Sequence, residues 1–194
     1  MEFSRDIQFG FKGGRDYVHG TDIYMFARSI NEAVGSRQPR SIRFHDLLRG
    51  DATLEPLNSS AATKAVCTLH FDDANDYGLV QRDSTSIAAR PYPEDEIVAS
   101  SEISDTGAVL EARTGFDSIE EAIALIKSWS NRYRPIDGKW LFAKIDAIGE
   151  SGPLPAMRTE TVSIRHVGGV GRRFNRFEVL CDDAAAMVFF GARG

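Results

Sequence analysis

Cysteine, long apolar runs and positive charge are all scarce in this 194-residue sequence, and each shortage excludes a class of protein. The two cysteines, Cys67 and Cys181, have no CxxC or metal-ligand spacing, which predicts buried, reduced thiols in a cytoplasmic protein. No apolar run approaches the ~18 residues of a membrane span, and the start, MEFSRDIQFG, lacks the basic and apolar regions of a secretion signal. We therefore expect no contact with membranes.

The charge balance is acidic, with 23 lysines and arginines against 28 aspartates and glutamates and a net charge of −5. A protein that binds by neutralising many phosphates needs a basic surface, so we expect no nucleic-acid partner. One local basic strip, containing Arg172, Arg173 and Arg176, does have the charge to bind a phosphate. The remaining composition is that of a globular protein, long enough to bury a core in one large or two small domains.

Two segments show the apolar periodicity of amphipathic helices. The first, 21–34, has Thr21 as its expected N-cap and Gly35 as its expected C′ residue. The second, 117–130, begins with a capping box formed by Asp117 and Glu120. Their predicted buried stripes are Ile23, Phe26, Ala27, Ile30 and Val34 in the first helix, and Ile119, Ala122, Ile123, Ile126 and Trp129 in the second.

A weak internal repeat relates the two halves of the chain. The expected caps Thr21 and Asp117 are 96 residues apart, and the same shift lays 63–70 over 159–166, with His70 matching His166. This pattern predicts a tandem duplication with a unit at 1–90, a unit at 91–194 and a hinge at 91–96. We expect the two halves to superpose in this register.

Strand-like segments separated by turn signals follow each helix, and EIVASSEI at 96–103 is expected to form a strand before the second helix. One helix followed by sequential strands predicts an α+β layer, in which an antiparallel sheet carries a helix on one face. Two folds built from β-α-β-β-β units fit this order. One is the hotdog fold, and the other is the vicinal-oxygen-chelate fold of glyoxalases.

Local motifs favour the first fold. The sequence YVHG before the first helix resembles the His-Gly element of hotdog thioesterases, and RFHDLLRGD at 43–51 resembles the family's strand after that helix, without its usual proline. The segment 177–191 resembles the last hairpin of the sheet. A glyoxalase-type site would need strand glutamates recurring beside His70 and His166, and none recur. The chain therefore resembles the hotdog superfamily of thioesterases and dehydratases, arranged as a pseudo-twofold tandem double hotdog whose sheets each wrap a central helix.

The resemblance implies a site at the start of the first helix, where hotdog enzymes hold an acyl thioester carbonyl. Unpaired first-turn N–H groups and the helix dipole favour a developing oxyanion there, and Gly20 permits close approach. His19 is the candidate for orienting the carbonyl or relaying a proton, and Asp22 and Glu120 are candidate carboxylate bases. Asp22 has the simpler role of complementing the helix dipole, and Glu120 that of closing its capping box. Phe116 stands before the second helix in place of a histidine-glycine pair, which predicts a degenerate site in that half.

The leading prediction is an acyl-thioester hydrolase, with coenzyme A or the phosphopantetheine of an acyl carrier protein as part of the substrate and no separate cofactor. Three alternatives stay open: a hydroxyacyl dehydratase using His19 with a carboxylate, a catalytically silent acyl or small-molecule binding module, and a glyoxalase-type metalloprotein. We expect no metal, because Asp72–Asp76 lacks the spacing of a calcium loop. His45, His70 and His166 are expected to be structural. A homodimer of the pseudo-dimer also remains open.

Overall fold

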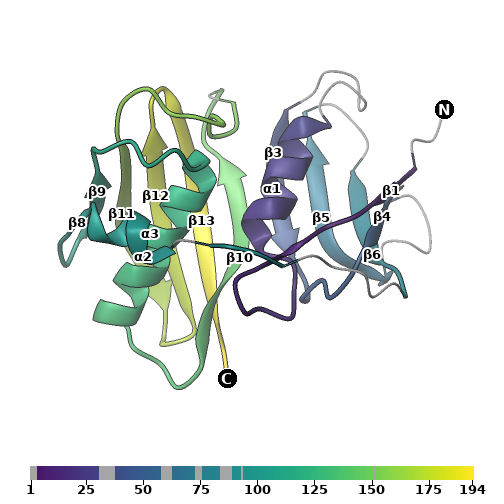
Figure 1. Cartoon of the computed structure of the whole chain (residues 1–194), viewed down its shortest axis with the longest axis horizontal. Helices are drawn as coiled ribbons and strands as arrows, with labels where there is room; N and C mark the ends of the chain where they lie inside the picture. Colours follow the sequence, from purple (N-terminus) through teal and green to yellow (C-terminus); the bar gives the residue numbers. More distant parts are fainter. Residues whose placement is uncertain are drawn as a thin grey trace. The chain divides into compact units, whose positions relative to one another are not determined.

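The computed structural model describes residues 4–30, 38–57, 63–72, 76–83, 89–92, 94–150 and 152–194. The chain divides into two compact units, Met1–Tyr92 and Pro93–Gly194. In each unit a helix packs against an antiparallel sheet (Figure 1), which confirms the predicted α+β class. Both cysteines are buried free thiols, as predicted. No helix in the described ranges is long and apolar enough to cross a membrane.

Unit 1 contains one helix, a five-stranded antiparallel sheet and a small parallel strand pair among its described residues. The sheet order is β1-β4-β6-β5-β3, and β2 pairs with β7. The elements are β1 (Arg5–Ile7), β2 (Phe11–Lys12), α1 (Gly20–Ser29), β3 (Pro39–Phe44), β4 (Ala52–Pro56), β5 (Ala65–Phe71), β6 (Tyr77–Gln81) and β7 (Ala89–Arg90).

Unit 2 contains two helices and six strands among its described residues. The strands are ordered β10-β13-β12-β11-β9-β8, and all neighbouring pairs are antiparallel. The elements are α2 (Glu94–Ala99), β8 (Glu102–Ile103), β9 (Gly107–Leu110), α3 (Ser118–Tyr133), β10 (Lys139–Ala147), β11 (Val162–Val170), β12 (Phe174–Cys181) and β13 (Ala184–Arg193).

The first predicted helix exists, but its N-cap differs from the prediction. His19 is the N-cap of α1, with extended dihedrals of φ −71° and ψ 137°, and Thr21 lies inside the first turn. The reason is that the Thr21 hydroxyl bonds the buried Lys12 amine instead of a first-turn N–H. The expected continuation to residue 34 and the C′ residue Gly35 lie outside the described residues.

The second predicted helix starts as predicted. Asp117 is the N-cap of α3, and the complete capping box with Glu120 is present. The expected strand over 96–103 is wrong over its first half, because Glu96–Ala99 belongs to α2. Three acids in the first turn of α2 stabilise its positive amino terminus, and its buried residue Ile97 faces the core.

The predicted register between the two halves is wrong. His70 lies on β5, which pairs with β3 and β6, whereas His166 lies on β11, which pairs with β9 and β12. In unit 1 the first strand after the helix, β3, pairs with β5. In unit 2 the first strand after α3, β10, pairs with β13. The two histidines thus occupy different places in their sheets. Alternation of apolar residues is the same for any strand, so a local sequence match does not fix which strands pair.

The helical stripes form much of each core. Ile23, Ile30, Ile119, Ile123 and Ile126 are at most 2% exposed, which confirms the predicted burial for these positions. Phe26 is an exception, because it is only half-buried and packs edge-on against Phe9 at a centroid distance of 5.8 Å.

Truncating the second stripe is expected to destabilise unit 2. Ile123→Ala removes a side chain that is 2% exposed and leaves a cavity, at a cost of about 2–5 kcal/mol in the free energy of unfolding. Urea denaturation followed by circular dichroism measures this cost. A loss near 0.5 kcal/mol, roughly that of a surface substitution, would show that α3 does not fill the core.

Candidate functional site

A cluster of polar side chains surrounds the start of α1 in unit 1. We call it the helix-start cluster, and it consists of Lys12, His19, Thr21, Asp22 and Tyr92. Lys12 comes from β2 and Tyr92 follows β7, so the parallel β2–β7 pair brings both to the helix. Four members are almost fully inaccessible, with exposures of 1% for Lys12, 7% for His19, 0% for Thr21 and 6% for Asp22.

The centre of this cluster is a buried ion pair. Lys12 Nζ lies 2.9 Å from Asp22 Oδ1 and donates a 2.7 Å hydrogen bond to Thr21 Oγ1. The amine also lies 5.2 Å from the centroid of the Tyr92 ring, within range of a cation–π interaction. A charge this deeply buried is tolerated only when it is paired and hydrogen-bonded. Lys12 and Asp22 therefore depend on each other.

The same hydroxyl orients the histidine ring. His19 Nδ1 lies 2.8 Å from Thr21 Oγ1, and the ring lies against Tyr92 with centroids 4.9 Å apart. Because an ammonium group only donates, Thr21 accepts from Lys12, and its own hydrogen is then available to His19 Nδ1. In this arrangement the proton of the neutral imidazole is on Nε2. The second ring nitrogen of His19 then carries the N–H group.

The N-cap residue of α1 does not cap the helix with its own side chain. His19 makes no capping hydrogen bond, so the N–H groups of Gly20 and Thr21 receive no acceptor from it. In α3, by contrast, Asp117 accepts from the Ile119 N–H and Glu120 Oε2 lies 3.3 Å from the Asp117 nitrogen. Three of the four predicted site residues, His19, Gly20 and Asp22, therefore meet at one helix start. The fourth, Glu120, closes the helix start of the other unit.

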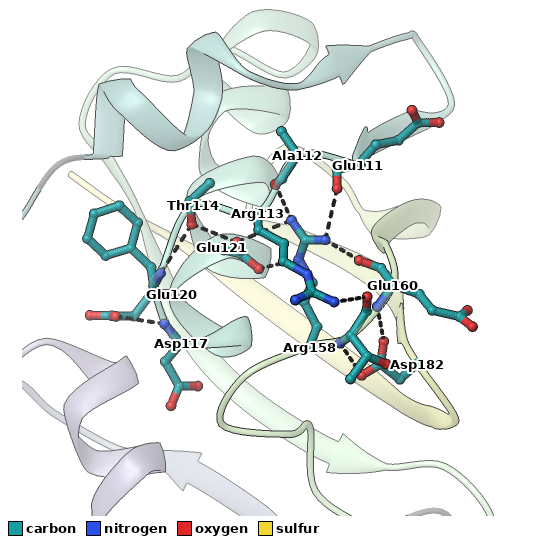
Figure 2. Close-up of polar contacts among 12 residues, drawn as sticks. Glu111, Ala112, Arg113, Thr114, Asp117, Glu120, Glu121, Arg158, Glu160 and Asp182 are labelled. Atoms are coloured by element: carbon teal, nitrogen blue, oxygen red, sulfur yellow. Dashed lines mark hydrogen bonds and ion pairs between the residues drawn. The ribbon is translucent and has the colours of Figure 1, made fainter.

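A second buried ion pair lies beside the start of α3 (Figure 2), and no motif in the sequence predicts it. Arg158 and Glu121 are 5% and 1% exposed, and Arg158 Nε lies 2.7 Å from Glu121 Oε2. Thr114 donates a 2.6 Å hydrogen bond to the other carboxylate oxygen. All five guanidinium N–H groups find acceptors, since the others bond Glu121 Oε1 and the carbonyls of Glu111, Ala112 and Glu160. These bonds hold the loop between β9 and α3 and the loop between β10 and β11 against α3.

The other histidines are engaged in local contacts. His45 Nε2 lies 2.7 Å from Thr68 Oγ1, and His70 Nδ1 lies 2.8 Å from Asp76 Oδ1. His166 stacks on Trp129 with centroids 4.4 Å apart. Within the described ranges, no group of three or more side chains could hold a metal ion, and part of Asp72–Asp76 lies outside them.

The environment of His166 predicts a pH effect on stability. Burial, followed by the nearby charge of Arg134, lowers the pKa of His166 below its ordinary value of 6.5. The unfolded chain then binds the proton more readily than the folded one, so stability falls as pH drops below about 6.5. We expect the free energy of unfolding to decrease between pH 7.5 and pH 5.5 by less in His166→Phe than in the wild type. Urea denaturation at the two pH values measures these decreases. An equal decrease in the wild type and in His166→Phe would contradict this assignment.

No protein-family model and no curated protein matches this chain. Among solved structures, the pyran synthase domain from module nine of the sorangicin pathway aligns over 100% of this chain and 97% of its own, with 13% identity and a TM-score of 0.52. A trans-AT PKS dehydratase domain from Brevibacillus brevis aligns over 100% and 94%, with 8% identity and a TM-score of 0.49. A protein named as an oleoyl thioesterase from Lactobacillus plantarum aligns over 100% and 97%, with 10% identity and a TM-score of 0.45. The chain has the hotdog fold, as its sequence motifs indicated.

Proposed function

We propose that the helix-start cluster of unit 1 binds the carbonyl of an acyl thioester and that the chain hydrolyses this thioester. The observation that carries the proposal is the start of α1, where the N-cap residue His19 makes no capping hydrogen bond with its side chain and is followed by Gly20. The fold supports it, because hotdog enzymes present this part of their central helix to a thioester. The acyl group would arrive on coenzyme A or on the phosphopantetheine of a carrier protein.

The chemistry follows from the donors at this helix start. When water adds to the carbonyl carbon, negative charge develops on the oxygen, and first-turn N–H groups stabilise it by on the order of 3 kcal/mol per donor. The Nε2–H of His19 supplies a further donor in the tautomer set by Thr21. The carbon–sulfur bond then breaks, and the thiol leaves with a proton from the attacking water. Lys12 and Thr21 act as positioning residues, because they hold the His19 ring without touching the substrate.

The test of this proposal is thiol release from a panel of acyl-coenzyme A esters of increasing chain length. The wild type is expected to turn over at least one ester, and Gly20→Leu to abolish turnover because its side chain blocks the approach to the helix start. Phe116→Ala serves as the control, since Phe116 stands at the closed start of α3. No thiol release from any ester, with acyl-coenzyme A still bound, would favour a silent binding module instead.

A second candidate is a dehydratase that uses the same carbonyl-binding site. The observation that favours it is the near-complete burial of the helix-start cluster, which suits proton transfer at the α and β carbons of an acyl chain better than entry of water. Incubation with a 3-hydroxyacyl thioester discriminates the two, because a dehydratase yields the enoyl thioester and no free thiol.

We also propose that the chain is a double hotdog, with one hotdog-like unit in Met1–Tyr92 and one in Pro93–Gly194. The support is that each unit has a helix followed by four described strands in an antiparallel sheet. Pro93–Gly194 expressed alone is expected to unfold cooperatively in urea. A non-cooperative transition would contradict its independence.

A further inference from the structure

A concave site in unit 2 gathers positive charge from two places in the chain. Its volume is about 700 Å³, and Arg172, Arg173, Arg193 and Asp137 are among its lining residues. Arg172 and Arg173 come from the turn between β11 and β12, Asp137 from the loop before β10, and Arg193 from the end of β13. We call it the arginine site. Its size lies within the roughly 300–1,000 Å³ typical of small-molecule sites.

The protein balances the positive charge of the arginine site only in part. In the part of the chain that the structure describes, neither Arg172 nor Arg173 forms an ion pair, and Asp137 is the one acidic side chain among the lining residues. Lys139 is the direct cross-strand partner of Arg193, which adds a like-charged pair where opposite charges would be favourable. A chain with a net charge of −5 thus concentrates cations here. An anionic ligand would relieve their repulsion.

The backbone around these arginines is well fixed. The Arg173 N–H donates to the Val170 carbonyl at 3.3 Å, and the Arg173 carbonyl accepts from the Ala192 N–H at 2.8 Å, which ties the turn to β13. In the loop before β10, a Cβ at Gly138 would lie only 2.3 Å from the Arg193 carbonyl oxygen. This close approach requires glycine and holds the loop before β10 against the end of β13. The arginines are therefore carried by a preformed frame.

We infer that the arginine site binds the phosphate groups of a small molecule, in the form of a phosphomonoester or a diphosphate. Guanidinium groups match phosphate oxygens with paired N–H donors, and a phosphate has enough oxygens to engage more than one arginine. A single carboxylate would leave most of the positive charge unbalanced. The inference is independent of the reaction proposed for unit 1, because it rests only on residues of unit 2.

Isothermal titration calorimetry at low ionic strength tests the inference with two probes, inorganic pyrophosphate and coenzyme A. Both carry a diphosphate, and only the second carries it on a nucleotide. The double variant Arg172→Gln/Arg173→Gln is expected to bind pyrophosphate about tenfold more weakly than the wild type. The control Arg43→Gln/Arg165→Gln also removes two exposed positive charges and is expected to bind within about twofold of the wild type.

The outcomes separate the sources of the ligand. Equal affinities for the two probes, both lost in the double variant, would identify the phosphate group itself as the ligand. Tighter binding of coenzyme A, with the difference lost in the double variant, would identify a nucleotide. No saturable binding of either probe would overturn the inference, as would the same loss in the control variant. Because binding is measured without turnover, a failed thioesterase assay leaves this result standing.

Discussion

Replacing Lys12 by methionine is expected to lower the free energy of unfolding by about 3–5 kcal/mol, because the change leaves the Asp22 carboxylate buried without its cation. The two side chains are 1% and 5% exposed, and their charged atoms are 2.9 Å apart. The loss also removes the donor that holds the Thr21 hydroxyl. Urea denaturation followed by circular dichroism measures the difference, and the hydrolase proposal plays no part in it.

Two comparisons make this prediction specific. Lys127→Met breaks the 2.7 Å pair with Glu94, whose side chains are 30% and 18% exposed, and is expected to cost at most about 1 kcal/mol. The double variant Lys12→Met/Asp22→Leu removes both buried charges, so it is expected to recover most of the lost stability. If Lys12→Met cost no more than Lys127→Met, the helix-start cluster would not contain a desolvated ion pair.

The helices were predictable because their signals are local. The stripe through Ile119, Ile123 and Ile126 and the capping box at Asp117 lie within a few turns of one segment, and the structure has them as predicted. The prediction of an N-cap at Thr21 failed for a reason that is not local. Its hydroxyl bonds Lys12, which lies on β2, outside the helix.

The pairings that create the sheet and the site are not visible in the sequence. The β2–β7 pair places Phe11 beside Ala89 and so brings Tyr92 to the helix start, although no motif links these segments. The alternation of Phe9 and Phe11 gives no indication that Lys12 is buried. The burial of Glu121 likewise depends on Arg158, which arrives from a distant loop. Such contacts form between segments that lie far apart in the sequence, so neither a local motif nor the internal repeat predicts them.

The site prediction with the largest effect concerns His19. If its Nε2–H stabilises the oxyanion, His19→Ala should lower kcat for the best acyl-coenzyme A ester by about 10²–10³, the cost of losing one oxyanion donor. KM should change much less, because the donor matters most as charge develops on the oxygen. His19→Gln keeps an N–H donor on a side chain of similar length and should retain part of the activity.

Thr21→Val provides the sharper test of how the ring is held, since it removes the hydroxyl that lies 2.8 Å from His19 Nδ1 and leaves His19 itself in place. A positioning role predicts a smaller drop in kcat than His19→Ala, and little further loss when both changes are combined, because the two residues act through the same donor. His45→Gln is the matched control, because that ring lies on the exposed side of unit 1 and contacts Thr68. Wild-type turnover in His19→Ala, with folding confirmed by circular dichroism, would remove His19 from the reaction and leave the first-turn N–H groups of α1 as the remaining candidates for binding the carbonyl.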